Sequence, residues 1–148
     1  GWYTENYTAS IPGALAGGAF LGSAAEGKIS SAARINYAEA AVVVLTSAGH
    51  EGKIYELAGD EAYTLQDLAL EVSRQTGKPI SYKNLPEADY ASALAGLGLP
   101  EPLAKAIASW DFAASKDDLF AEGHQLSALI GHPTTSLPEV VSDVLKSL

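Results

Sequence analysis

Cysteine and methionine are both absent from the 148-residue sequence. Without cysteine, the chain can form no disulfide, bind no metal through a thiolate and use no thiol nucleophile. This absence is compatible with a cytosolic protein, and we expect a cytoplasmic location. Because the chain starts at Gly1 and has no methionine, we expect either a processed protein or a part of a longer one.

Basic residues and long apolar runs are scarce. Nine Lys and Arg face eighteen Asp and Glu, which gives a formal net charge of −9. The basic residues are scattered singly, so no cluster could follow a phosphate backbone, and we expect no nucleic-acid partner. The longest apolar run, residues 38–45, contains Glu39 and is far shorter than the roughly 20 residues of a membrane span. The 47% apolar and 18% charged composition predicts a globular domain.

Several catalytic and cofactor motifs are also missing. No Gly-rich dinucleotide turn, P-loop or nucleophile elbow is present, and no tyrosine is followed four residues later by lysine. The three histidines, His50, His124 and His132, have neither a second histidine nor a carboxylate at ligand spacing. We therefore expect no metal site.

The pattern of apolar residues, caps and breakers predicts an α/β chain with a few short strands and a helical tail. Thr64 with Asp67, and Ser136, are typical of helix starts, and Asn36 with Glu39 is interpreted in the same way. The predicted strands are residues 28–35, 53–59 and 80–86, with a brief extension at 19–22. The predicted helices are residues 12–16, 36–48, 64–79, 86–98, 100–115, 124–133 and 136–148. So few strands are typical of the remainder of a doubly wound fold rather than of a whole one.

Two stretches combine aromatic and polar residues. The first, GWYTENY at residues 1–7, offers aromatic walls and one amide, which suits a planar ligand with polar edges, although such a cluster is more often the edge of a core. The second, ASWDFAASKDDLF at residues 108–120, has two interpretations. Trp110 and Phe112 either lie in the core, which is the favoured interpretation, or form the rim of an apolar pocket for a flat ligand.

A family resemblance follows from three separated segments in order. They are GWYTENY, KISSAARINYAEAAVVVLTSAGHEGKIYELAGDEAYTLQDLA and LIGHPTTSLPEVV. They resemble the NmrA-like branch of the atypical short-chain dehydrogenase/reductases, and within it the bacterial flavin-free NAD(P)H:quinone oxidoreductases of the type-2 kind. The resemblance runs through the whole chain. It implies that residues 1–148 are the C-terminal half of an NAD(P)-binding Rossmann-like fold: the end of the core plus a small substrate lobe, without the Gly-rich half.

The resemblance also implies a site. The segment like GWYTENY follows a core strand and lies at the nicotinamide end of NADPH, with NADH as the alternative and with no flavin or metal. Cofactor contact is carried over to Gly1, Trp2, Tyr3, Thr4, Glu5 and Asn6, and Tyr3 and Asn6 are the candidate catalytic residues. The position of Asn36 is often Asp in relatives, so a role for that carboxylate does not carry over.

The implied activity is direct hydride transfer to a quinone, with Trp110 and Phe112 as candidate pocket residues. The alternative from another class is an NmrA-like redox-sensing regulator that binds dinucleotide without turnover. The isolated chain is expected to be inactive, because the phosphate-binding half is absent. A homo-oligomer is left open.

Overall fold

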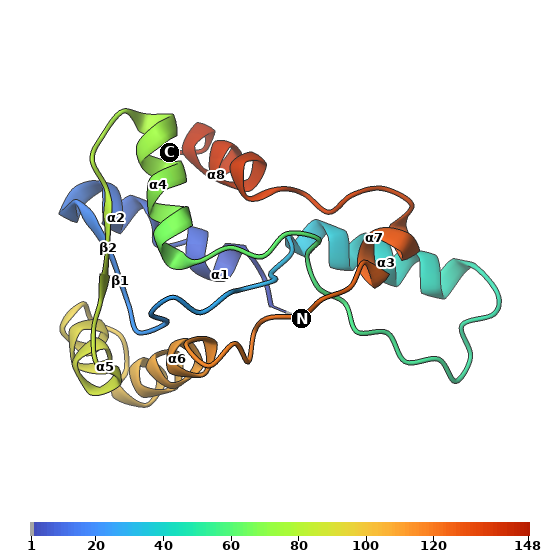
Figure 1. The fold of residues 1–148 in the computed structure, drawn as a ribbon, viewed down its shortest axis with the longest axis horizontal. Helices are drawn as coiled ribbons and strands as arrows, with labels where there is room; N and C mark the ends of the chain where they lie inside the picture. The colour runs from blue at the N-terminus through green and yellow to red at the C-terminus, as the bar shows by residue number, and fades with distance from the viewer. Residues whose placement is uncertain (1) are drawn as a thin grey trace. The chain divides into compact units, whose positions relative to one another are not determined.

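The computed structural model describes residues 2–148 and divides the chain into two compact units. The first unit comprises Gly1–Ala9, Ser30–Ala62 and Ala121–Leu148, and the second comprises Ser10–Ile29 and Tyr63–Phe120. Figure 1 shows the elements of both units. In the part of the chain that is described, no helix has the length and apolarity that crossing a bilayer requires.

A parallel pair of short strands lies at the centre of the second unit. Strand β1 (Ala19–Gly22) pairs in register with β2 (Ser81–Asn84). Helix α4 (Leu65–Thr76) packs against both strands, and α2 (Ile11–Gly17) packs against β1. The apolar stripe predicted for α4 is confirmed as its buried face, which consists of Leu65, Leu68, Ala69 and Val72. The parallel pair with its helices confirms an α/β fold.

Two helices complete the second unit. Helices α5 (Glu87–Gly96) and α6 (Glu101–Ala114) pack against each other, as Figure 1 shows. The buried face of α6 consists of Ala104, Ala108, Asp111 and Ala114. Small residues at this spacing allow a neighbouring segment to approach closely. At one such approach, a Cβ on Gly27 would collide with the backbone carbonyl of Ala114.

The first unit is mainly helical. Helix α3 (Arg34–Thr46) packs against α7 (Gln125–Ile130), and α1 (Glu5–Thr8) packs against α8 (Leu137–Lys146). Its core cluster consists of Ala32, Ala40 and Leu126, with Tyr37, Leu57, Leu129 and Ile130 packed around them. The predicted cap at Ser136 is confirmed, because its side chain and that of Glu139 form a reciprocal capping box.

Three predictions of local structure are wrong. Asn36 does not cap α3, because the helix starts two residues earlier after Ala33, and Asn36 lies buried in its first turn. Residues 53–59 form no strand. In residues 28–35, only isolated bridges at Ile29 and Ala32 occur. A strand needs a partner along its length, and within residues 2–148 neither segment has one.

Candidate functional site

The segment of Trp2 to Thr8 forms an aromatic cluster in the first unit. The rings of Trp2 and Tyr7 lie 6.4 Å apart, centroid to centroid, at 50°. The ring of Tyr3 meets that of Tyr37 edge-on, at 5.3 Å and 76°. Both geometries are favourable for aromatic pairs. The cluster therefore holds the start of α1 against α3.

Backbone and side-chain hydrogen bonds fix this segment in place. The Thr4 amide donates to the carbonyl of Ala32 at 3.0 Å, and the Ala32 amide donates to the carbonyl of Trp2 at 3.0 Å. The buried Thr4 hydroxyl lies 2.8 Å from the hydroxyl of Ser31. Both carboxylate oxygens of Glu5 accept from the Arg34 amide, at 2.9 and 3.1 Å, where α3 begins. An acidic side chain at a helix N-terminus is favourable, so Glu5 links the two helices.

Tyr3 and Asn6 differ from these neighbours because their polar groups are available. The Tyr3 side chain is 42% exposed, and the Arg34 guanidinium lies 5.1 Å from its ring centroid. Asn6 is exposed, and its backbone amide donates to the Tyr3 carbonyl at 3.0 Å. Among residues 2–148, neither the Tyr3 hydroxyl nor the Asn6 side-chain amide has a hydrogen-bond partner. Two neighbouring donors on a fixed segment can therefore serve a ligand.

Tyr37 is a supporting residue that sequence reasoning missed. Its hydroxyl donates to the carbonyls of Trp2 and Leu57, both at 3.4 Å. Desolvation by burial raises its pKa above the ordinary 10, and the charges of Tyr3 and Glu5 act in the same direction, against the hydrogen bond to Trp2. Tyr37 is thus a neutral phenol at physiological pH and supports the Tyr3 ring.

The other predicted site residues lie on α6 in the second unit. Trp110 and Phe112 are 46% and 44% exposed, so the interpretation that they lie in the core is wrong. The reason is that α6 buries its small residues and Asp111 instead. The Lys116 ammonium lies 5.0 Å from the centroid of the Phe112 ring. A role in binding a flat ligand stays a prediction for both aromatics, and the predicted contact of Gly1 lies outside the described residues.

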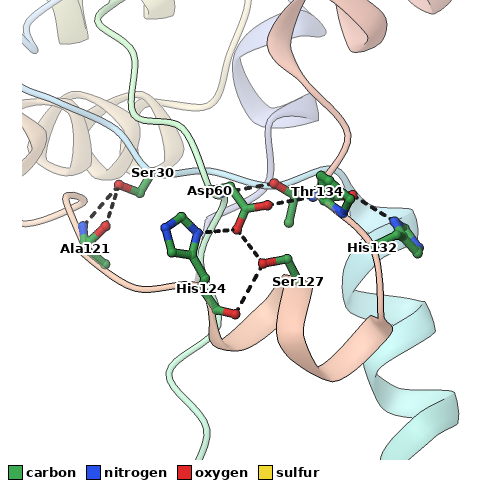
Figure 2. A network of polar contacts seen from close by, with 8 residues as sticks. Ser30, Asp60, Ala121, His124, Ser127, His132 and Thr134 are labelled. Carbon is green, nitrogen blue, oxygen red and sulfur yellow. Dashed lines mark hydrogen bonds and ion pairs between the residues drawn. The ribbon is translucent and has the colours of Figure 1, made fainter.

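A second polar cluster in the first unit surrounds Asp60 (Figure 2). One carboxylate oxygen accepts from the Ser127 hydroxyl at 2.6 Å and lies 2.8 Å from Nδ1 of His124. The other accepts from the Thr134 amide at 2.9 Å, and the Thr134 hydroxyl accepts from the Asp60 amide at 3.0 Å. Asp60 therefore joins α7 to the segment before α8.

This cluster is not a hydrolytic triad. The Ser127 hydroxyl donates to Asp60 rather than to the imidazole of His124, so the serine–histidine hydrogen bond of a triad is not formed. His132 lies nearby, with Nδ1 2.8 Å from the Pro133 carbonyl and Nε2 3.2 Å from Glu39. Within residues 2–148, no three acidic or histidine side chains are grouped so as to hold a metal ion. The Asp60 cluster is a structural link.

Asp60 gives a pH-dependent prediction. Desolvation acts to raise its pKa, but the hydrogen bonds from Ser127, His124 and Thr134 and the charge of His124 outweigh it and lower the pKa from 3.8 to about 2. A lowered carboxyl pKa stabilises the fold above pH 4, and this contribution is lost as the pH falls through about 2. After solvent screening, we expect Asp60→Asn to cost about 1–2 kcal/mol at pH 7 and only a small part of that near pH 2. Urea unfolding at both pH values measures this, and an equal cost at both would contradict it.

No family model matches the chain. The chain is 57% identical over 142 residues to Quinone oxidoreductase 2 of Escherichia coli. The matched region makes up 96% of this chain and 50% of that protein. The crystal structure of that NADPH-dependent quinone oxidoreductase with NADPH matches with a TM-score of 0.96 and 56% identity, over 98% of this chain and 51% of that one. The chain thus spans about half the length of this relative.

A more distant relative has the same fold. The crystal structure of the Citrobacter sp. triphenylmethane reductase with NADP(H) matches with a TM-score of 0.92 and 30% sequence identity. The match covers 97% of this chain and 50% of the reductase chain. These matches agree with the fold and the resemblance predicted from the three sequence segments. By sequence and by fold, the chain therefore matches NADPH-dependent reductases over about half of their own length.

Proposed function

We propose that this chain is the C-terminal part of a protein that reduces quinones with NADPH. The observation that carries the proposal is the 57% identity to Quinone oxidoreductase 2 of Escherichia coli across 96% of the chain. That similarity covers 50% of the relative, so the activity is proposed for the longer protein. The chain alone contains no Gly-rich turn for the pyrophosphate, and we expect it to be inactive.

The residues of the first unit suit the nicotinamide end of the cofactor. The Tyr3 ring is an exposed aromatic surface, and the Tyr3 hydroxyl and Asn6 amide are available donors. Thr4 and Glu5 are engaged with Ser31 and Arg34, so we infer that they position the segment. The cofactor, when bound, supplies the hydride that is transferred to the quinone.

This chain's own part in the reaction is orientation and charge stabilisation. We infer that the Tyr3 hydroxyl and the Asn6 amide donate hydrogen bonds to the quinone oxygen or the nicotinamide carboxamide. A donor aimed at an oxygen that gains negative charge lowers the barrier, because it is already oriented before the reaction. For Trp110 and Phe112 on α6, whose rings are partly exposed, binding of a flat ligand is a separate proposal.

The test uses the longer protein that contains this chain. Tyr3→Phe and Asn6→Ala are each expected to lower kcat/KM about 10- to 100-fold in NADPH oxidation with a quinone, because each removes one donor. Ser147→Ala, which removes an exposed hydroxyl at the end of α8, is the control and should change neither kcat nor KM. Unchanged kinetics in both site variants would remove these residues from the mechanism. NADPH binding without oxidation by any quinone would instead support a regulator.

A further inference from the structure

The two arginines of the chain are held differently. The Arg74 guanidinium on α4 donates to both carboxylate oxygens of Glu71, at 2.6 and 2.8 Å. The Arg34 side chain is exposed at the start of α3, and its guanidinium lies 5.1 Å from the centroid of the Tyr3 ring. Among residues 2–148, no carboxylate forms an ion pair with that guanidinium. Arg34 therefore carries a positive charge without an acidic partner, beside the candidate site.

Contacts within the first unit fix the place of this charge. The Arg34 amide donates to both carboxylate oxygens of Glu5, so the carboxylate holds the backbone of Arg34 and not its guanidinium. Tyr3 and Ala32 form a parallel bridge, so two segments run in the same direction here. The starts of α1 and α3, which carry Asn6 and Arg34, follow this bridge. In open α/β folds, ligands bind beyond the carboxyl ends of parallel strands, so Arg34 is at a place where a ligand is expected.

The chemistry of this arrangement suits an acidic group on an aromatic ring. A guanidinium binds the oxygens of a carboxylate or sulfonate through paired, charge-assisted hydrogen bonds. The Tyr3 hydroxyl belongs to the ring that the guanidinium covers, so a ligand that reaches this hydroxyl lies close to the charge. The whole chain has a formal net charge of −9, so this isolated cation is not part of a general basic surface.

We propose that Arg34 determines specificity for the acceptor by binding an acidic substituent, a carboxylate or sulfonate, on the ring of the quinone. The inference rests on the proposed function for the quinone and adds the charge of the preferred substrate. The guanidinium binds and orients the ring, and it exchanges no proton or electron with it. An acidic quinone is therefore expected to be preferred over its uncharged parent.

A pair of quinones tests this in the longer protein that contains the chain. The probes are naphthoquinone sulfonate and unsubstituted naphthoquinone, and the measured quantity is the ratio of their kcat/KM values in NADPH oxidation. Arg34→Gln is expected to lower this ratio about tenfold, because it removes the charge from the hydrogen bonds to the sulfonate. Arg34→Lys keeps the charge and should retain more of the ratio. An unchanged ratio in Arg34→Gln, or equal ratios in the two variants, would overturn the inference.

Arg74→Gln makes the same chemical change on α4 and is the matched control. It should leave the ratio unchanged, because the Arg74 guanidinium is paired with Glu71. A fall as large as that of Arg34→Gln would reveal a general effect of net charge and overturn the inference. A higher KM for NADPH in Arg34→Gln, without a change in the quinone ratio, would place the anion on the cofactor and would overturn it as well.

Binding without turnover separates this inference from the proposed function. Naphthalenesulfonate has no quinone to reduce, and its binding to the longer protein is measured by calorimetry, with naphthol as the uncharged comparison. A preference for the sulfonate that Arg34→Gln abolishes, together with no oxidation of NADPH by any quinone, would support binding of an acidic ring at Arg34 and contradict the proposed function. Quinone reduction without that preference would do the reverse.

Discussion

Gly59→Ala is expected to destabilise the first unit by about 3 kcal/mol or more, since overpacking against backbone cannot be relieved by a side-chain rotation. A Cβ at Gly59 would collide with the carbonyl oxygen of Ser31 and lie 2.9 Å from its carbon. The Gly59 amide also donates to the carbonyl of Ser30 at 3.0 Å, which holds the two segments together at this point. Moving the Ser31 carbonyl away from a Cβ at residue 59 would disturb the hydrogen bond between the amide of residue 59 and the Ser30 carbonyl. For a chain of this length, Tm should fall by roughly 6–12 °C.

Gly13→Ala is the matched control for this prediction. Gly13 lies inside α2, and a Cβ there would have no atom within 4 Å. Alanine in a helix interior is favoured over glycine by about 0.5–1 kcal/mol, so this variant should be slightly more stable. Calorimetric unfolding of both variants measures the contrast. A Gly59→Ala protein with unchanged Tm would show that residues 30–32 move aside at little cost.

Local signals predicted the helices with defined caps. Thr64 with Asp67, and Ser136 with Glu139, satisfy the first amides of α4 and α8 through residues only three positions apart. Such interactions depend on neighbours in sequence, so the pattern alone identifies them. The strand at residues 80–86 was also predicted, and residues 81–84 of it pair in parallel with β1.

Distant contacts explain the failures. Asn36 has the residue type of a cap, but its oxygen accepts from Thr135, which lies 99 positions away, and this contact places it inside the helix. Residues 53–59 alternate like a strand, but strand formation depends on a partner that no local pattern reveals. Asp60 and Ser127 had no sequence signal, because their hydrogen bond spans 67 positions.

The resemblance named Tyr3 and Asn6 as the candidate catalytic residues, and that role stays a prediction. The aromatic and amide composition of residues 1–7 pointed to this region, and the structure shows which of its polar groups are engaged. Thr4 and Glu5 are held by Ser31 and Arg34, whereas the Tyr3 hydroxyl and the Asn6 side-chain amide have no hydrogen-bond partner among residues 2–148. Composition could not separate these pairs, because a threonine hydroxyl and a tyrosine hydroxyl are both donors until burial and partners are known.

Asp111→Ala is the second substitution with a large expected effect. Asp111 is 3% exposed on α6, and its carboxylate accepts from the buried amide of Ser23 at 2.8 Å. Alanine would leave that amide without an acceptor and a gap beside Gly22, where an added Cβ would lie 2.7 Å from the carboxylate. A buried donor that loses its partner costs about 1–3 kcal/mol, and the gap adds to this cost. The urea midpoint should fall accordingly, and an unchanged midpoint would contradict this account.

Asp111→Asn separates the charge of this carboxylate from its shape. The amide oxygen can still accept from Ser23, so the loss of stability should be smaller than in Asp111→Ala. Burial, and next the charge of Asp111, raise the pKa of Tyr82 from 10 to about 12. A raised tyrosine pKa stabilises the fold below pH 10, and this contribution is lost as the pH rises through about 12. Without the charge, burial remains, so the pKa of Tyr82 should fall but stay above 10, and the alkaline loss of stability should become smaller. Tyrosinate absorbance during an alkaline titration measures the shift, and an unmoved Tyr82 would show that Asp111 acts on it only through packing.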